Sequence, residues 1–418
     1  MTDDAPRPLT VVGIGADGWA GLSPAAAEAL CDANVVVGSA RQLALVADQV
    51  RRTEAWPSPM SEAIGTLLER FPGQRIAVLA SGDPMFYGVG TSLVEAHGAD
   101  RVTVVPHPSS ISLACARLGW DMAAIDVASA VGRPLAAVAR YLHPGRRVLV
   151  LVSEDDAAGR IAKLLCDSGF GPTTIRVLQQ LGGPDEAILT GTATSWEARL
   201  HNPLAIVALD LAVSPDAAPP GLTPGLADET YDHDGALTKQ EIRAVTLAAL
   251  APHPGELLWD VGAGSGSIAI EWMRAHPANV AVAIEPRPDR SARIAANADR
   301  LGVPGLRIVE GEAPGVLEHL PTPDAIFVGG GLTDPGVLDA CLAAIRPGGR
   351  FIANAVTIET EALVIETQAR LGGRLTRIAI SHADPMGSFT AFRPTLPVTQ
   401  WIWRRPDTAP EDPTEDQS

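Results

Sequence analysis

Three glycines follow a short apolar run in the second half of the chain, at a spacing that lets a backbone approach a small ligand closely. The run is 257–259, Asp260 follows it, and an amphipathic segment, 268–273, begins directly after the glycines. The turn between them consists of Gly262, Ala263, Gly264, Ser265 and Gly266. A strand, a glycine turn and a helix in this order predict a site for a nucleotide-like ligand, because the free N–H groups of the helix start face it.

A carboxylate stands where it could bind the ribose of such a ligand. A second apolar run, 280–284, ends in Glu285, and a carboxylate at the end of the next strand can accept hydrogen bonds from both ribose hydroxyls. The third glycine of a nicotinamide-binding fingerprint would fall at position 267, which is Ser267. A nicotinamide-dependent oxidoreductase is therefore the less favoured alternative for this turn.

The elements that follow extend the same pattern. A segment with Glu312 and Ala313, the apolar run 325–328 and the turn 346–349 come next in the chain. In this order, the span from about 237 to 404 resembles the class I S-adenosylmethionine (SAM) methyltransferases. The resemblance implies that SAM is bound by the glycine turn, Glu285, Glu312, Ala313 and Thr238.

The first half of the chain repeats a strand-to-loop pattern three times. The β-rich runs 9–14, 76–79 and 102–105 end in the loops 13–18, 80–84 and 107–111. The segments G-D-P-M-F-Y-G at 82–88 and H-P-S-S-I-S-L-A-C-A-R-L-G-W at 107–120 resemble the tetrapyrrole (precorrin) methylase family. The resemblance covers roughly 9–213 and implies a class III methyltransferase fold, in which SAM lies in a cleft between two α/β subdomains.

This second resemblance also names cofactor residues. It implies SAM contacts from Gly13, Gly15, Gly82, Asp83, Pro84, Ser109 and Ser110. Two departures from the family pattern stand out. The first loop lacks the proline of G-x-G-P-G, and the segment 129–133, which matches S-x-H-G-R, carries Val131 where the family has histidine. Asp83 could alternatively serve only to orient its turn.

The predicted fold class is α/β throughout. A tetrapyrrole methylase domain of two α/β subdomains spans 1–213, a linker rich in proline and small residues spans 214–227, and a Rossmann-like class I domain spans 228–405. The acidic tail 406–418 is predicted to be disordered.

A class III methylase joined to a class I domain is a specific pairing. It resembles the bifunctional precorrin-6Y (6B) C5,15-methyltransferase (decarboxylating) family of cobalamin biosynthesis. The resemblance implies methylation of precorrin-6B at C5 by the N-terminal half, and methylation at C15 with loss of the ring C acetate carboxyl by the C-terminal half, giving precorrin-8X. SAM is the cofactor implied. The same reaction on the cobalt-bearing precursor stays open as an alternative.

Candidate catalytic residues precede the first helix of the class I domain, where class I enzymes often close over substrate. They are His233, Asp234 and Lys239. Thr238 and Glu241, three residues apart, also predict a capping box for a helix that runs to Leu250. The substrate carries many carboxylates, so arginines are expected around it, and the candidates are Arg243, Arg377 and Arg393.

Bulk properties exclude several classes of function. A net charge of −17 argues against nucleic acid and anionic membranes as partners. No apolar run approaches the length of a membrane span, and the four scattered cysteines fit no metal site and indicate reduced thiols in the cytoplasm. The expected partners are a small tetrapyrrole substrate and further copies of the chain in a homo-oligomer. A non-catalytic interaction protein is disfavoured by the two glycine loops.

Overall fold

The computed structural model describes residues 8–197, 201–202 and 205–407 of the 418-residue chain. It divides into two compact units, Met1–Arg133 with Pro144–Ala217, and Pro134–His143 with Ala218–Ser418. The short segment 134–143 therefore groups with the second unit, although the sequence pattern assigns it to the first domain. Residues 1–7 and 408–418, which include most of the predicted tail, lie outside the described residues.

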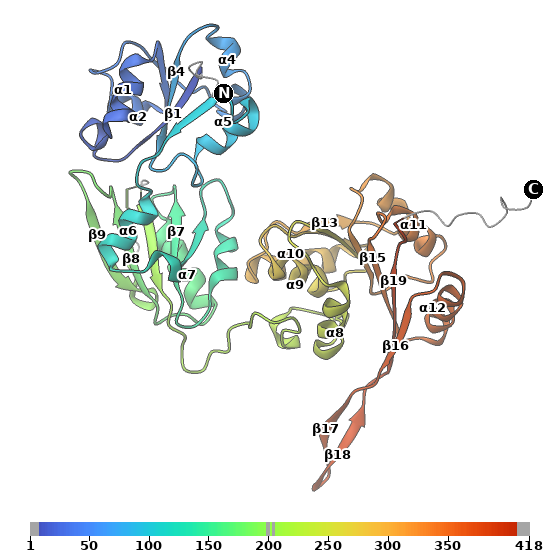
Figure 1. The fold of residues 1–418 in the computed structure, drawn as a ribbon. Coiled ribbons are helices and arrows are strands. Elements are labelled where there is room, and N and C mark those ends of the chain that lie inside the picture. Colours follow the sequence, from blue (N-terminus) through green and yellow to red (C-terminus); the bar gives the residue numbers. More distant parts are fainter. Residues whose placement is uncertain (1–7, 198–200, 203–204, 408–418) are drawn as a thin grey trace, which may run out of the picture. The chain divides into compact units, whose positions relative to one another are not determined.

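The first unit contains two five-stranded sheets. The N-terminal sheet is parallel, with the order β3-β2-β4-β1-β5 (Figure 1). Its strands are β1 Leu9–Ile14, β2 Val35–Gly38, β3 Thr53–Ala55, β4 Ile76–Ser81 and β5 Val102–Val105. Its helices are α1 Pro24–Asp32, α2 Ala40–Ala44, α3 Ser61–Ile64, α4 Leu67–Arg70 and α5 Val89–His97. The strands read as apolar runs because hydrophobic clusters bury both faces of the sheet.

The second sheet of this unit is mixed, with the order β6-β7-β10-β8-β9. Its strands are β6 Asp126–Ser129, β7 Arg147–Val152, β8 Thr174–Gln179, β9 Ala187–Thr192 and β10 Ala205–Asp210. Helices α6 Ser110–Leu118 and α7 Ala157–Asp167 accompany it. Two α/β subdomains therefore follow one another, as the resemblance to class III enzymes implies.

The second unit is built on a seven-stranded sheet with the order β13-β12-β11-β14-β15-β19-β16, in which only β19 runs antiparallel to its neighbours. The strands are β11 Leu257–Val261, β12 Val280–Glu285, β13 Arg307–Glu310, β14 Ala325–Val328, β15 Arg350–Ala355, β16 Arg374–Ile378 and β19 Val398–Arg404. Helices α8 Gln240–Leu250, α9 Ser267–Ala275 and α10 Pro288–Arg300 pack on one face. Helices α11 Val337–Ala344 and α12 Ile358–Leu371 pack on the other. The order reverses at β11, so a crevice opens at its carboxyl end.

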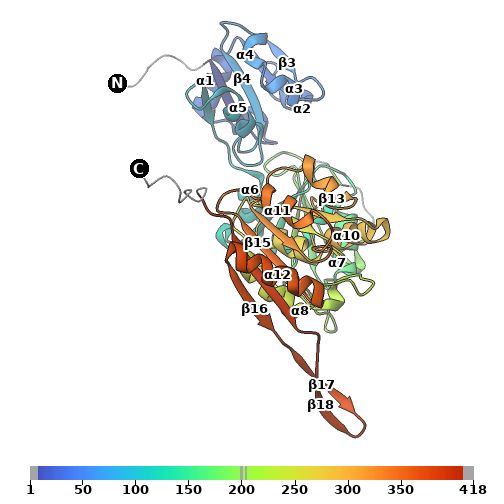
Figure 2. The same ribbon diagram turned by 90° about the vertical axis from the view of Figure 1, so that its right-hand side faces the viewer.

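A long hairpin, β17 Ser381–Met386 and β18 Phe389–Pro394, extends away from this sheet (Figures 1 and 2). Phe389 and Phe392 on it are 74% and 78% exposed. The sequence pattern did not predict this hairpin. Among the residues that the structure describes, no helix is both long and apolar enough to cross a bilayer.

The starts of helices α1 and α8 are capped differently. Ser23 accepts a hydrogen bond from the N–H of Ala26 at 3.2 Å, with Pro24 as the first residue of α1, as a helix start requires. The capping box predicted for Thr238 and Glu241 is wrong. Helix α8 has Lys239 as its N-cap, and the Lys239 side chain makes no capping hydrogen bond.

Candidate functional site

The glycine turn after β11 is shaped by close approaches of backbone to backbone. Gly262 and Gly264 have φ angles of +71° and +60°, in the left-handed region that side chains disfavour. A Cβ on Gly262 would lie 2.7 Å from the carbonyl oxygen of Gly330, and one on Gly264 would lie 2.8 Å from that of Ala236. The turn is thus held between the loop after β14 and the segment that precedes α8.

Glu285 ends β12 beside this turn, as predicted. Its Oε2 accepts the N–H of Gly264 at 2.9 Å, and its Oε1 accepts the N–H of Arg287 at 3.2 Å. The residue is only 2% exposed, yet it lines a cavity. The carboxylate is therefore fixed in orientation by two backbone donors and still faces open space.

Asp260, the residue before Val261 at the end of β11, is a second buried carboxyl group at the same edge of the sheet. Burial raises its pKa from 3.8 to about 7, a hydrogen bond from the N–H of Ala269 opposes the rise, and the charge of Glu285 adds to it. The site therefore contains a carboxyl group that can be protonated near neutral pH.

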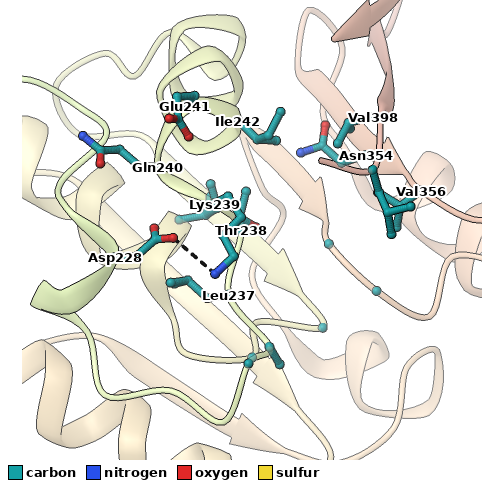
Figure 3. Close-up of a pocket in the computed structure, with 18 of the residues that line it drawn as sticks. Asp228, Leu237, Thr238, Lys239, Gln240, Glu241, Ile242, Asn354, Val356 and Val398 are labelled. Carbon is teal, nitrogen blue, oxygen red and sulfur yellow. Dashed lines mark ion pairs between the residues drawn. The ribbon is translucent and has the colours of Figure 1, made fainter. Parts of the chain in front are cut away.

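Gly262 lines two cavities, with volumes of about 830 and 560 Å³. The smaller one is lined by Glu285, Arg290, Asp334 and the segment 311–313, which includes Glu312 and Ala313. The larger one is lined by Gly262, Ala263 and Gly264, by 235–242, and by residues of β15 and of the base of the hairpin (Figure 3). Such volumes are those of small-molecule sites.

The residues present fit SAM. The glycines permit a tight turn in which a Cβ would collide with the neighbouring chain, the N-terminus of α9 adjoins this turn, and the carboxylate of Glu285 stands at the end of the neighbouring strand. Two predicted residues, Ser265 and Gly266, do not line either cavity. Ser265 is 2% exposed, and Gly266 packs on Ile294 at the start of α9. Their contribution is to the shape of the turn.

Lys239 and Thr238 both line the larger cavity, from the segment that leads into α8 (Figure 3). The Nζ of Lys239 lies 3.3 Å from Oδ2 of Asp228, which also lines the cavity. The lysine side chain is 57% exposed, so its ammonium group is accessible to a ligand.

His233 and Asp234 lie outside the lining of both cavities. Asp234 contacts three arginines of the neighbouring segment, with Arg290 Nε closest at 3.0 Å from Oδ2. The N–H of Ala236 and then Arg290 lower its pKa to about 2. His233 accepts the N–H of Gly235 through Nδ1 at 3.1 Å. These contacts fix the loop that carries Thr238 and Lys239, and a direct catalytic part for either residue stays a prediction.

Arg243 was predicted as a candidate for binding substrate carboxylates, and its complete burial contradicts this. The side chain is fully buried, with its Nε 2.6 Å from Oε1 of Glu271 and further hydrogen bonds to the carbonyls of Thr238 and Leu226. All of these partners belong to the same unit, so the guanidinium connects α8 to α9 and to the segments that contain Thr238 and Leu226.

The other two arginine candidates do not line the cavities either. Arg377 pairs with Glu361 beside Thr399, and Arg393 lies on the hairpin 3.8 Å from Asp384. Both are well exposed, at 60% and 69% of the side chain.

Sequence reasoning missed Asn354, the next-to-last residue of β15, which lines the larger cavity. Its Nδ2 donates to Oγ1 of Thr246 at 2.9 Å, and its Oδ1 accepts from Gln400 at 2.9 Å. Gln400 also donates to Thr246 at 3.1 Å. The sequence feature that could have identified it is a single polar residue, Asn354, within the otherwise apolar segment 351–355.

The first unit has its own cavity, of about 970 Å³, between its two sheets. Residues at the ends of β1, β4 and β5 line one side, and residues of β7, β8 and β10 line the other. A cavity between the two subdomains is what the class III resemblance implies for SAM.

The predicted cofactor residues of this half fall into two groups. Gly15, Gly82 and Ser110 line the cavity. Gly13, Asp83, Pro84 and Ser109 do not, and they shape its walls instead. A Cβ on Gly13 would lie 2.3 Å from the carbonyl oxygen of Gly82, Asp83 accepts the N–H of Met85 at 2.8 Å, Ser109 caps α6, and the Pro84 carbonyl abuts Gly88.

Both positions that depart from the tetrapyrrole methylase pattern lie at the cavity of the first unit. Ala16, at the place of the family proline, lines the cavity. Asp17 follows it and lies 3.7 Å from Nε2 of His107, with its Oδ1 buried and without a hydrogen bond. Val131, at the place of the family histidine, lines the same cavity and is 49% exposed.

Comparisons with known proteins assign each half of the chain to a methyltransferase family. Residues 8–196 match the family of tetrapyrrole (corrin/porphyrin) methylases, and residues 229–405 match the precorrin methyltransferase domain. Two separate proteins of Salmonella typhimurium each match less than half of the chain. A cobalt-precorrin-7 C(5)-methyltransferase is 33% identical over 43% of this chain and 88% of its own length. A cobalt-precorrin-6B C(15)-methyltransferase (decarboxylating) is 30% identical over 39% and 85%.

One relative matches almost from end to end. The precorrin-6Y C(5,15)-methyltransferase (decarboxylating) of a Sinorhizobium species is 47% identical over 95% of this chain and 96% of its own length. The first match spans strands β1 to β9 of the first unit, and the second spans the whole seven-stranded sheet of the second unit. The chain therefore belongs to the bifunctional precorrin-6Y C(5,15)-methyltransferases (decarboxylating).

Proposed function

We propose that this enzyme methylates precorrin-6Y (6B) at C5 and C15 and removes the carboxyl group of the ring C acetate, giving precorrin-8X in cobalamin biosynthesis. The N-terminal unit acts at C5, and the C-terminal unit acts at C15 and in decarboxylation. The observation that carries the proposal is the presence of two separate glycine loops at strand ends, each opening on a cavity of its own. The end-to-end relative and the two single-site relatives support the same division.

SAM, when bound, supplies a methyl group already activated on a sulfonium sulfur. The chain's own task is therefore to hold a nucleophilic carbon of the macrocycle in line with that methyl group and to exclude water, which can contribute about 7–11 kcal/mol. In the C-terminal unit, Glu285 and the turn 262–264 bind the cofactor, and Lys239 and Asn354 face the space that remains. No general base is needed until a proton leaves the methylated carbon.

Three finer points belong to the same proposal. The enzyme forms a homo-oligomer, which the exposed Phe389 and Phe392 of the hairpin support. It works in the cytoplasm, which the four free cysteines support. The metal-free substrate is favoured because the end-to-end relative is named for precorrin-6Y without cobalt. Turnover of matched metal-free and cobalt-bearing substrates distinguishes the two cases.

Product mass spectrometry tests the proposal. With SAM labelled in its methyl group, the full chain should add two labelled methyl groups and release carbon dioxide. Fragmentation should locate the labels at C5 and C15. A product with a single methyl group at saturating SAM, or binding of the macrocycle without turnover, would contradict it.

A further inference from the structure

The cavity of the N-terminal unit carries an unusual charge for this protein. The whole chain has a net charge of −17, yet the described residues that line this cavity include no aspartate or glutamate. They do include two arginines, Arg41 and Arg133. By contrast, the larger cavity of the C-terminal unit is lined by Asp228, Glu229, Glu241 and Asp260 together with its cations. The N-terminal cavity is therefore a local positive region in an acidic protein.

Neither arginine forms an ion pair with a carboxylate within the described part of the chain. Nη2 of Arg41 donates to Oγ of Ser81 at 2.9 Å, which anchors the guanidinium at the end of β4. Arg133 lies over the ring of Tyr87, with its Cζ 5.3 Å from the ring centroid. By contrast, Arg117 of the same unit is paired with Glu186. Because a guanidinium has five N–H donors, most donors of both residues remain free for a ligand.

An aromatic surface adjoins these charges. Phe86 and Tyr87 both line the cavity, are 41% and 50% exposed, and pack edge to face with centroids 5.0 Å apart. Tyr87 has a φ of +53°, a left-handed conformation that is rare for an aromatic residue and that clusters at functional sites. The strained backbone at Tyr87 therefore places its aromatic ring beside the guanidinium of Arg133.

We infer that Arg41 and Arg133 bind carboxylates on the periphery of the macrocycle during C5 methylation, while Phe86 and Tyr87 support its face. This inference rests on the proposed function and adds the residues that select a polycarboxylated, planar ligand. The forked guanidinium matches a carboxylate in two hydrogen bonds, and an aromatic ring stacks on a conjugated plane. The two arginines come from different subdomains, so one ligand with several carboxylates can engage both at once.

The competing explanation is that the arginines bind the carboxylate of SAM. The two possibilities differ in which ligand loses affinity, so both are measured on the full chain. The variants are Arg41→Gln, Arg133→Gln and the double variant, with Arg101→Gln as a matched control, because Arg101 is an exposed arginine of the same unit that does not line the cavity. Uroporphyrin, a stable polycarboxylated tetrapyrrole, is the probe for the macrocycle, and SAM is titrated separately.

Each single substitution should weaken uroporphyrin binding about tenfold or more, since each removes a charge-assisted pair, and should leave SAM binding unchanged. Uroporphyrin binding by the wild type should weaken as the salt concentration rises, and the double variant should lose this salt dependence. Tyr87→Leu should weaken uroporphyrin binding without changing its salt dependence. Tyr87→Phe, which keeps the aromatic ring, should bind uroporphyrin as the wild type does. In turnover, the KM for the macrocycle in C5 methylation should rise with C15 methylation unaffected.

Several outcomes overturn the inference. They are unchanged uroporphyrin binding in the double variant, an equal loss in Arg101→Gln, or a loss confined to SAM. Unchanged SAM binding in the same samples verifies that the variants are folded. If the arginine variants weaken uroporphyrin binding but the wild type adds no methyl group at C5, the proposed function fails and the binding inference stands.

Discussion

The Nε of Arg243 donates to Oε1 of Glu271 at 2.6 Å, and both side chains are buried in the C-terminal unit. The same carboxylate accepts the N–H groups of Gly225 and Leu226 at 2.6 and 3.1 Å and the hydroxyl of Tyr231 at 2.8 Å. One buried ion pair thereby ties the end of the interdomain linker to α8 and α9. The segment that lines the larger cavity begins a few residues further on.

Arg243→Met should lower the free energy of unfolding by about 3–5 kcal/mol, because it leaves the buried carboxylate of Glu271 without its cation. Urea unfolding of the full chain at neutral pH measures this. Arg377→Met is the control, since that exposed arginine should cost less than about 1 kcal/mol. A loss in Arg243→Met no larger than in the control would show that the pair does not stabilise the unit.

Asp260 should make stability depend on pH. Its pKa is raised from 3.8 to about 7 by burial, so between about pH 4 and pH 7 the unfolded chain releases this proton while the folded chain keeps it. The free energy of unfolding then falls as pH rises through this window, by up to about 4 kcal/mol, and the cost persists above it. Asp260→Asn keeps an acceptor for the N–H of Ala269 but cannot ionise.

The difference in unfolding free energy between Asp260→Asn and the wild type is the quantity to measure, because other titrating groups cancel in it. Relative to the wild type, the variant should gain stability from about pH 4.5 to about pH 7.5. A constant difference across this range would mean that Asp260 titrates normally in the folded protein.

Much of the fold could be predicted because parallel strands buried on both faces read as unbroken apolar runs. The predicted runs 257–259, 280–284 and 325–328 correspond to β11, β12 and β14. The hairpin of β17 and β18 escaped prediction because its residues are mostly exposed, and an exposed ribbon need not alternate apolar and polar residues.

The site was harder to predict than the fold, because spacing in sequence reveals position but not burial. Glu285 follows from its place at a strand end, since that position is fixed by topology. Arg243 resembles any helix-surface arginine until Glu271, 28 residues later, places it in the interior. Arg41 and Tyr87 face the N-terminal cavity because the two sheets of that unit, formed within 9–105 and 126–210, meet there.

Lys239 should matter more to the C-terminal reaction than the two candidates beside it. Lys239 lines the cavity, whereas His233 and Asp234 lie outside its lining. Lys239→Met should therefore reduce C15 methylation or decarboxylation at least about tenfold more than His233→Ala does, by loss of a charged contact to substrate. Rates of methyl incorporation at C15 and of carbon dioxide release check this. A His233→Ala variant as impaired as Lys239→Met would restore the histidine as a catalytic candidate.

Glu285 offers a graded test of the class I cofactor site. Glu285→Gln keeps an acceptor for the N–H of Gly264 but loses the charge that faces the cavity, and Glu285→Ala loses both. SAM affinity of the C-terminal site should fall by about 1.5–3 kcal/mol in Glu285→Gln and further in Glu285→Ala. Calorimetric titration should show one weakened and one unchanged SAM site, and two weakened sites would indicate that the variant perturbs both units.

The most direct test of two independent methylation sites is the position of the methyl group that Glu285→Ala adds to the substrate at limiting SAM. If the N-terminal unit acts at C5 and the C-terminal unit at C15, methyl-labelled SAM gives a product labelled at C5 and unlabelled at C15, while the wild type labels both carbons. Labelling at C15 without C5, or equal loss at both carbons, would contradict it.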